Sequence, residues 1–518
     1  MYNIIVETMI RVATVAGTRL ASLPQVYAGL VGDEVEAFPA LRPHQRHAWH
    51  AFLVQLGAMA MHRAGVSEPP ADAERWADLI RGLTPEFPDD EPWQLVVDDI
   101  TKPAFMQPPA SSPDLEKDYK GVVATPDELD MLVTSKNHDL KTSTAAQAGA
   151  DDWIFALVTL QTMEGFGGAG NYGVSRMNGG LGSRPAFSLA PPGGTGAHVK
   201  RDIEALLSDY PVAAGTHELL WLLPWDGASA QRLLPTELAP LYIEVCRRIR
   251  LRRDEAGNIH AIRTSSKAAR IEGKDIKGRT DDPWTPHNPN RDGLPLTLAG
   301  GGFNYKRVNE YLISWDQPDL LRPTGHEQRS DETMQLVARG MVRGQGKTEG
   351  YFERAIPIRS RARGALLRRT GRDSMADLGE LAKRRIDRIA IVQRILSHAI
   401  QTFAARGDSD NVSPEHRQLA RPWLNRLDEV IDDRFFDDLQ DEFEVDGDAA
   451  REAKHHEWLR DFVVPQSRRI LSDATDSLPC PSIHRYRARE NATGLFEGRL
   501  RGNGGLPFLF DDPQENNA

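Results

Sequence analysis

The sequence predicts an α+β protein, with a large mixed N-terminal domain followed by a C-terminal helical bundle. Glycine and proline cluster between short apolar segments up to residue 373, which is typical of short strands and helices joined by irregular loops. From Ser374 onward, apolar residues recur with a helical period through successive segments. We therefore predict domains at 1–373 and 374–510, with a four-helix bundle in the second and a flexible tail at 511–518.

Length and composition indicate a globular protein without a disulfide framework. At 518 residues the chain is too long for one hydrophobic core, and its 40% hydrophobic and 26% charged residues are ordinary for a soluble protein. The two cysteines, Cys246 and Cys480, lie far apart, which favours neither a disulfide nor a cysteine-ligated zinc and fits a reducing cytoplasm. The longest apolar run, 52–61, is shorter than a membrane span requires. We expect a cytoplasmic protein with no metal, cofactor or membrane partner.

Short regular elements are predicted near the N-terminus. Apolar β-branched residues alternate with polar ones over 2–20, which favours a hairpin, and 23–30 is typical of a short helix. Residues 43–64 predict a longer helix, with a proline near its start and a glycine just after its end. Its histidines lack a nearby carboxylate and do not share one face, so metal binding is not expected; they are His44, His47, His50 and His62. Residues 93–100 are predicted to form a strand.

The segment 165–182 is the most glycine-rich part of the chain. It opens with Gly165, Phe166, Gly167, Gly168, Ala169 and Gly170. Because glycine inside a helix or strand costs backbone entropy and packs no side chain, we predict a loop whose backbone approaches a ligand or another backbone closely. The spacing G-x-G-x-x-G also occurs in dinucleotide sites, but residues 171–180 cannot form the helix that such a site requires. The residues leave three interpretations open: a nucleic-acid-facing loop, a plain surface loop and a dinucleotide site.

Positive charge gathers in two segments, although the net charge of the chain is −11. Residues 247–279 hold eleven Lys and Arg against four Asp and Glu, and residues 339–372 hold ten against two. Both segments are rich in Gly, Ser and Thr, which favours contact with phosphates over a merely solvated face. A polar loop at 132–143 offers further donors of the kind that contact phosphates, namely Lys136, Asn137, His138 and Lys141.

Residues 343–348 resemble the end of a P-loop without fulfilling the motif. The first glycine of the motif would fall on Met341, and no clean helix follows. We instead predict a hairpin tip, at which Gln345 forms a polar wedge between Arg343 and Lys347.

Helices are predicted from residue 374 to the tail. Ser374 is placed to cap the first helix, which stops at Gly407, and Ser413 begins a second that runs to about residue 443. Residues 448–472 predict a third helix with a kink or break at Pro465, and 481–494 a weaker fourth. Successive helices with short connections are typical of an antiparallel bundle.

The order of these motifs resembles the CasA large subunit of type I-E CRISPR surveillance complexes, called Cascade, over essentially the whole chain. The resemblance rests on an ordered set rather than on one motif: the segments 105–107 and 136–138, the glycine loop 165–182, the turn 283–287, the Gln345 tip and the C-terminal bundle. Some CasA-like proteins carry a cysteine-rich zinc knuckle in mid-chain. This sequence has only Cys246 there, so zinc is not expected.

The resemblance implies a non-catalytic subunit of a guide-RNA (crRNA) ribonucleoprotein. Such subunits read the protospacer-adjacent motif in double-stranded DNA, mainly from the minor groove, open the adjacent base pairs and help to recruit a helicase–nuclease. By this resemblance the glycine loop Gly165–Gly170, a lysine finger at Lys274 or Lys277 and the Gln345 wedge contact the motif, with Arg343 and Lys347 beside the wedge. The loop Lys136–Lys141 would contact the complex and the 5′ end of the guide.

An alternative function is a nucleic-acid-modifying enzyme that uses the glycine loop to bind a cofactor. Such an enzyme would need clustered metal-binding carboxylates or a strand–glycine loop–helix unit. We find neither pattern in the sequence.

Overall fold

The computed structural model describes residues 2–129, 148–211, 215–344, 347–367 and 372–510, except for the side chains of 347–348 and 372–376. Helices and small sheets alternate along the chain, so the predicted α+β class is confirmed. The chain forms two compact units: Met1–Phe303 with Ser314–Ile358, and Asn304–Ile313 with Arg359–Ala518. These units divide the chain after Ile358, whereas the predicted domain boundary follows residue 373.

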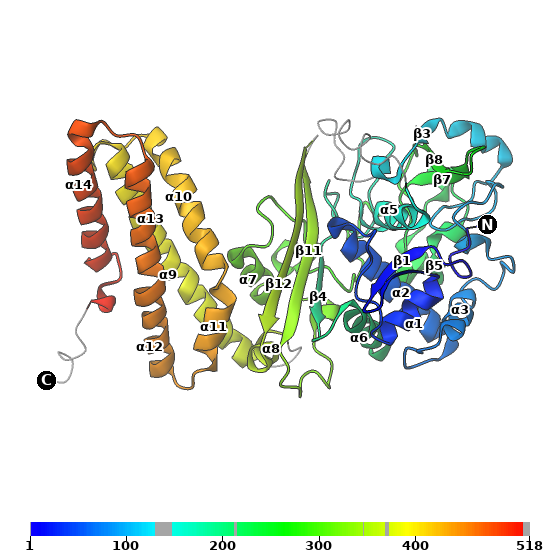
Figure 1. Cartoon of the computed structure of the whole chain (residues 1–518), viewed down its shortest axis with the longest axis horizontal. Coiled ribbons are helices and arrows are strands. Elements are labelled where there is room, and N and C mark those ends of the chain that lie inside the picture. The colour runs from blue at the N-terminus through cyan, green and yellow to red at the C-terminus, as the bar shows by residue number, and fades with distance from the viewer. Residues whose placement is uncertain (1, 130–147, 212–214, 345–346, 368–371, 511–518) are drawn as a thin grey trace. The chain divides into compact units, whose positions relative to one another are not determined.

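Helices build the N-terminal part of the first unit (Figure 1). They are α1 (Leu23–Val31), α2 (Arg46–Ala64), α3 (Ala73–Arg81), α5 (Ala150–Met163) and α6 (Thr195–Ser208). The long helix α2 is buried along most of its length because it packs against α3, α5 and α6. It is preceded by a 3-10 turn at Pro43–Gln45 and ends at Gly65, whose φ of 65° is left-handed. The predicted helices at 23–30 and 43–64 are therefore confirmed.

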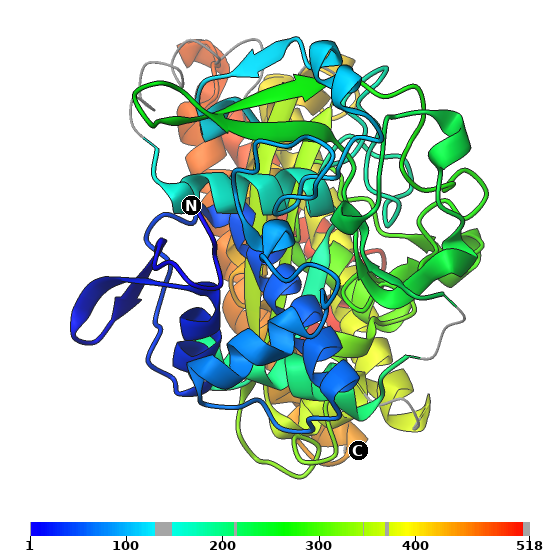
Figure 2. The ribbon, with the colours of Figure 1, turned by 90° about the vertical axis from the view of Figure 1, so that its right-hand side faces the viewer.

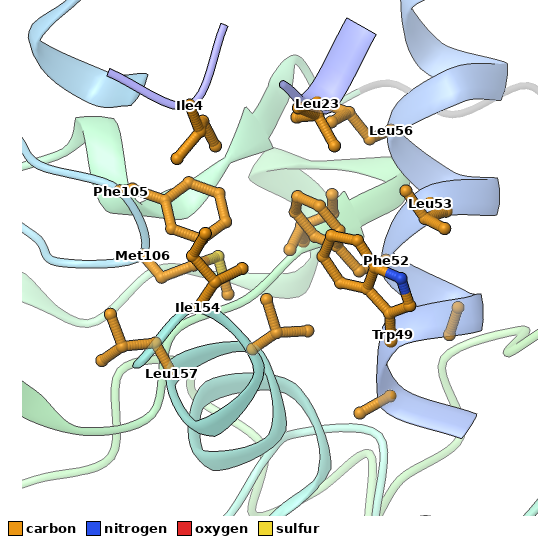
Figure 3. Packing of buried hydrophobic residues seen from close by; sticks show 14 of the residues in the cluster. Ile4, Leu23, Trp49, Phe52, Leu53, Leu56, Phe105, Met106, Ile154 and Leu157 are labelled. Atoms are coloured by element: carbon orange, nitrogen blue, oxygen red, sulfur yellow. The ribbon is translucent and has the colours of Figure 1, made fainter. Parts of the chain in front are cut away.

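Large apolar side chains from several of these segments meet in one core (Figure 3). The labelled side chains come from α1, α2 and α5 and from loops near the N-terminus and residue 105: Ile4, Leu23, Trp49, Phe52, Leu53, Leu56, Phe105, Met106, Ile154 and Leu157. The rings of Phe52 and Phe105 pack edge to face with centroids 5.6 Å apart. Gln107 is also buried, and its amide donates to Leu95 O at 2.9 Å. The predicted 105–107 segment thus contributes to the core.

Small sheets surround this core. The strands are β1 (Ile10–Thr14), β2 (Gly17–Ala21), β3 (Gly121–Val123), β4 (Ala186–Ala190), β5 (His217–Leu219), β6 (Leu238–Ile243), β7 (Arg248–Arg253), β8 (Ile259–Thr264), β9 (His287–Asn288), β10 (Leu294–Pro295), β11 (Met334–Gly344) and β12 (Lys347–Ile358). The hairpin predicted over 2–20 is confirmed as β1 and β2, which pair from Ile10 to Ala21. Strands β5 and β6 pair in parallel, whereas β9 and β10 form an antiparallel pair.

Two three-stranded sheets position the glycine-rich loop. One has the order β12-β11-β4, with β11 antiparallel to both neighbours, and the other has the order β3-β8-β7. Figures 1 and 2 both place α5 next to the β3-β8-β7 sheet. Gln161 near the end of α5 joins them, since its amide donates to Arg247 O at 2.9 Å and accepts from Cys246 N at 2.9 Å. These hydrogen bonds hold the end of α5, and with it the start of the glycine-rich loop, against the chain that enters β7.

The strand predicted at 93–100 is wrong. Residues Glu91–Trp93 form a 3-10 turn, and Leu95 N donates to Tyr2 O at 2.9 Å. Arginine side chains then donate hydrogen bonds to a carbonyl that would pair with a neighbouring strand. The Arg250 and Arg252 guanidinium groups both donate to Val97 O, at 3.1 and 2.9 Å. The apolar pattern reflects burial of the segment without strand pairing.

The second unit consists of helices, of which α9, α10, α13 and α14 lie side by side (Figure 1). The helices are α7 (Tyr305–Ile313), α8 (Ser360–Leu366), α9 (Arg372–Ala404), α10 (Pro414–Asp432), α11 (Phe435–Glu444), α12 (Asp448–Trp458), α13 (Val464–Ser477) and α14 (Ser482–Arg501). Helix α9 packs against α10, α13 and α14, which places its apolar stripe inside the bundle. Ser413 caps α10 by accepting a hydrogen bond from His416 N, as predicted.

Three predicted boundaries in this unit differ from the structure. Helix α9 begins at Arg372 rather than after Ser374, and the helix predicted from Ser413 to 443 divides into α10 and α11 between Asp432 and Phe435. The break predicted at Pro465 is a π-helical stretch, Leu459–Val463, directly before α13. Proline has no backbone N–H to donate to the carbonyl of the preceding turn. The wider π-helical turn accommodates the missing hydrogen bond, so the helix continues without a break. Among the described residues, none of the helices is long and apolar enough to cross a membrane.

Candidate nucleic-acid interface

The glycine-rich loop connects α5 to β4 and folds back on itself. Gly165 N donates to Gly182 O at 3.0 Å, and Phe166 N donates to Gly180 O at 2.9 Å. A tighter turn at its tip is closed by Gly167 N, which donates to Asn171 O at 2.8 Å. The loop follows a helix and leads into a strand, which is the reverse of the order in a dinucleotide site. That interpretation of G-x-G-x-x-G is therefore wrong.

The structure favours glycine in this loop for two different reasons, close backbone contact at some positions and a left-handed backbone at others. A Cβ on Gly165 would overlap Gly180 O, and a Cβ on Gly173 would lie 2.6 Å from the Gly165 carbonyl carbon. These glycines let two backbone segments touch. Gly168 and Gly179 instead have φ angles of 112° and 66°, and a Cβ on either would meet nothing within 4 Å. They are the positions at which an external ligand could approach the backbone.

A buried arginine holds the base of the loop. Arg247 donates to Gly165 O at 3.0 Å, also donates to Tyr172 O, and pairs with Glu164 at 3.2 Å. Three other arginines of the basic segment are likewise buried and donate to backbone carbonyls: Arg248, Arg250 and Arg270. The predicted phosphate-facing role of the whole segment 247–279 is therefore wrong for these four residues.

Three exposed lysines of the same segment line a cavity of about 700 Å³, which we call the first cavity. Residues of the glycine loop and of the chain from Lys267 to Lys277 line it. Lys267, Lys274 and Lys277 are exposed and make no side-chain hydrogen bond or ion pair with any residue that the structure describes. Three uncompensated ammonium groups near one cavity produce a positive potential there.

A rigid turn presents the two candidate finger lysines. Lys277 has a left-handed φ of 49°, and its amide donates to Gly273 O at 3.0 Å. Arg279 braces this turn by donating to Ile276 O, Asp275 O and Asp292 O at 2.9 to 3.1 Å. A left-handed lysine is costly, and such strain persists only where the surrounding contacts enforce it. Both lysines line the first cavity, so the structure leaves both as candidates for the finger.

A second cavity, of about 660 Å³, is lined by other residues of the loop. It is lined by Gly167 and Asn171 from the loop and by cations from four strands or their ends: Lys120, Arg248, Arg263 and Arg343. Predicted residue Arg343 therefore lies apart from Lys274 and Lys277, which line the first cavity. Arg263 belongs to the predicted basic segment 247–279, whereas Lys120 was not predicted, because an isolated cation beside a short strand carries no sequence signal.

Several predicted residues fall outside what the structure describes. Strands β11 and β12 pair down to Gly344 and Lys347, which confirms the hairpin, but Gln345 at its tip is among the residues not described. The same holds for the Lys347 side chain and for the loop residues Lys136, Asn137, His138 and Lys141.

The histidines of α2 do not gather as a group. His50 instead meets two residues of α6: its Nε2 lies 2.7 Å from Asp202, and His198 Nε2 lies 3.4 Å from the same carboxylate. These three could hold a metal ion, and they form the one such group among the described residues. Hydrogen bonds already occupy them, since Arg201 donates to Asp202 at 2.9 Å and His198 Nε2 lies 2.8 Å from Ser188 Oγ. Burial lowers the pKa of His198 to about 4, which keeps this ring neutral.

We predict that Gly179→Asn weakens selective duplex binding about tenfold without unfolding the protein. Asparagine tolerates the left-handed φ of 66°, and its side chain projects into open space at the wall of the first cavity. Gly65→Asn is the matched control, because Gly65 has a φ of 65°, equally open surroundings and a place in the chain far from the loop. Titration of labelled duplex measures the effect. Equal binding by both variants would exclude a close approach of DNA at Gly179.

Comparison with known proteins agrees with this architecture. The family model of CRISPR-associated protein Cse1 matches residues 3–463 of the chain. The structure of Thermus thermophilus CasA (Cse1) is similar, with a TM-score of 0.65 at 14% identity over 96% of this chain and 99% of that one. Cse1 from Acidimicrobium ferrooxidans has a TM-score of 0.62 at 14% identity, covering 96% of this chain and 97% of its own. Cse1 from Thermobifida fusca has a TM-score of 0.62 at 15% identity, covering 98% and 99%. No curated protein matches the sequence significantly.

Proposed function

Because the chain belongs to the Cse1 family of CRISPR-associated proteins, we propose that it reads the protospacer-adjacent motif for a guide-RNA surveillance complex. In this proposal it is a non-catalytic subunit that works in the cytoplasm. It binds double-stranded DNA beside the guide-matched segment, helps to open the duplex and helps to recruit a helicase–nuclease. Its other partners are the subunits and the crRNA of Cascade.

The observation that carries the proposal is the pairing of unneutralised lysines with an open glycine backbone around one cavity. Lys274 and Lys277 have no acidic partner among the described residues, and Gly179, which lines the same cavity, has open space beside its Cα. The DNA minor groove is narrow, so slim groups such as a lysine chain or a bare glycine backbone can enter it. Its donor and acceptor pattern is degenerate, and we expect a small set of related motifs to be accepted.

The second cavity supplies a further phosphate contact in this proposal. Arg343 lines it, the Arg343 side chain makes no ion pair or hydrogen bond with described residues, and only Gly344 separates it from the hairpin tip. An arginine beside the tip can hold the DNA backbone while Gln345 separates the first base pair. Unstacking one step costs a few kcal/mol, which contacts of this kind must offset. The loop Lys136–Lys141 is assigned to the complex and to the guide 5′ end by family resemblance alone.

The proposal is tested by target binding of a guide-RNA complex assembled with and without this chain. The duplexes carry a randomised trinucleotide beside the guide-matched segment, and bound molecules are sequenced. We expect binding to require the chain and to select a subset of trinucleotides. A chain that joins the complex but leaves all trinucleotides equally represented would contradict motif reading. Cleavage of labelled duplex by the purified chain with a divalent metal would contradict the non-catalytic role.

A further inference from the structure

The inner part of the first cavity has a chemistry that contact with a duplex groove does not require. Its buried lining includes Val174, Met177 and Cys246, which pack together as a small apolar cluster, and the carboxylate of Glu244. Its outer part carries the lysines described above. An apolar interior with one polar group and a cationic rim is typical of a site for a small polar ligand.

We propose that this cavity binds one unpaired nucleotide, with the base inside and the phosphate at the lysines. The inference rests on the proposed function, because it takes the nucleotide from the strand that is released beside the motif. A volume of about 700 Å³ lies within the range of small-ligand sites and is too small for a duplex to enter. The base must therefore leave its stack. Base flipping costs a few kcal/mol, mostly for unpairing and unstacking. Opening of the duplex beside the motif has already supplied most of this free energy.

Two aromatic rings stand where the base would enter. Phe166 is 39% exposed, although large apolar side chains are usually buried, and it lines the cavity together with Tyr172. Their ring centroids are 6.3 Å apart with an interplanar angle of 52°. The Tyr172 hydroxyl donates to Lys267 O at 3.1 Å, which ties this ring of the glycine loop to the chain at Lys267. Aromatic side chains of this kind stack on bases of any sequence.

Glu244 supplies the polar recognition group. Its Oε2 accepts a hydrogen bond from Ser175 N at 2.8 Å, whereas its Oε1 is buried without a hydrogen-bond partner among the described residues. Burial raises the pKa of Glu244, and Arg176 acts in the opposite direction. A buried carboxylate oxygen without a donor is costly, so a ligand that brings an N–H group to it gains binding energy.

The missing donor indicates which bases fit. Cytosine, adenine and guanine carry an exocyclic amino group that can donate to Oε1, whereas thymine carries carbonyl oxygen at the corresponding position. We therefore expect the cavity to prefer a base with an amino group. Recognition by one hydrogen bond to a carboxylate is worth about tenfold in affinity.

The test uses the assembled guide-RNA complex and duplexes with an accepted motif and one unpaired nucleotide directly beside it. That nucleotide is adenine or unsubstituted purine, which differ only in the exocyclic amino group. We expect the wild-type complex to bind the adenine duplex about tenfold more tightly. Equal affinity for the two duplexes, with motif selection intact, would overturn the nucleotide site and leave the proposed function standing. Loss of motif selection with both duplexes would instead overturn the proposed function.

The variant Glu244→Gln sharpens the test. The hydrogen bond from Ser175 N still needs an acceptor, so the amide oxygen of the glutamine faces Ser175 N. The NH₂ group of the glutamine then takes the place of Oε1. A donor then replaces an acceptor, and we expect the preference for adenine to disappear while motif selection persists. Glu272→Gln removes the same charge from a carboxylate that pairs with Arg232 at 3.5 Å, and it should retain the preference. An unchanged adenine preference in Glu244→Gln would overturn the role of Glu244.

Free AMP distinguishes the source of the nucleotide. Because the phosphate contacts are few and exposed, AMP alone should compete only at millimolar concentrations. Micromolar binding of AMP by the complex would contradict assignment to a DNA strand. The comparison of adenine with purine in the wild type does not depend on the folding of any variant.

Discussion

Replacing Lys274 and Lys277 together by Ala is expected to weaken motif-selective duplex binding roughly hundredfold at low salt. Both ammonium groups lie at the first cavity without an acidic partner among the described residues, so neither is diverted into an internal ion pair. A hydrogen bond from a charged group contributes about 1.5–3 kcal/mol, and the removal of two such hydrogen bonds to DNA at the lower end of this range, about 3 kcal/mol in total, accounts for this factor. The salt dependence of binding should also weaken, by about two counterions per complex.

Matched substitutions separate a local contact from a change in total charge. Lys200→Ala with Lys383→Ala removes two exposed lysines that form helical pairs with Glu204 and Asp387, and binding should be retained. The single variants Lys274→Ala and Lys277→Ala then identify the finger, since the lysine in the groove should carry most of the loss. If the double variant and its control lost affinity equally, the lysines would act only through long-range charge.

The variant Asp282→Asn is expected to destabilise the first unit by about 3–5 kcal/mol, because it leaves a buried arginine unpaired. Arg184 directly follows the glycine loop, is 1% exposed, and donates to Asp282 Oδ1 at 2.6 Å. Asp282 also accepts from Trp284 N at 3.1 Å, and the Arg184 guanidinium lies over the Trp284 ring at 5.1 Å. The pair therefore joins the end of the glycine loop to the Pro-Trp turn.

The pH dependence of stability tests the same pair. Burial alone would raise the pKa of Asp282, but Arg184 and Arg176 outweigh it and lower the pKa below its usual value of 3.8. The pair therefore stabilises the wild type above about pH 4, and this stability is lost as the pH falls through the lowered pKa. Denaturant unfolding from pH 7 to pH 3 should show this loss in the wild type and not in Asp282→Asn.

Two controls accompany this measurement. Asp281→Asn alters an exposed neighbour with a left-handed φ of 49°, which asparagine tolerates, and should change stability little. Adding Arg184→Met to Asp282→Asn removes the unpaired charge and should recover part of the stability. If the second substitution destabilised the protein further by the same amount as the first, the unpaired charge would not be the cause.

Local chemistry made several elements predictable from the sequence. Ser413 with Pro414 begins α10, Gly65 follows α2, and glycines flank the turn between β11 and β12, because caps and turns depend on neighbouring residues only. The family itself is also confirmed, since the Cse1 family model matches residues 3–463. The roles of Gln345 and Lys136–Lys141 stay predictions.

Interactions between distant segments explain what the sequence could not show. The basic segment 247–279 looks uniform, yet Arg247, Arg250 and Arg270 are buried because carbonyls far away in sequence accept their hydrogen bonds. Residues 93–100 look like a strand, but arginine side chains occupy their carbonyls. Glu244 has no sequence signal at all, since it is a single acidic residue directly after an ordinary apolar strand.

Residue patterns alone were enough to predict the fold class, the helical bundle, the glycine loop and the basic segment 247–279, within which the family resemblance selects Lys274 and Lys277. These features follow from periodicity, backbone freedom and local charge, all of which depend on residues that are close together in the sequence. Folding in three dimensions determines which glycines face open space, which cations stay unpaired, and that Arg343 lies in a different cavity from Lys274 and Lys277. Burial and hydrogen bonding of a side chain depend on partners that only the folded chain brings within reach, and a linear pattern does not contain them.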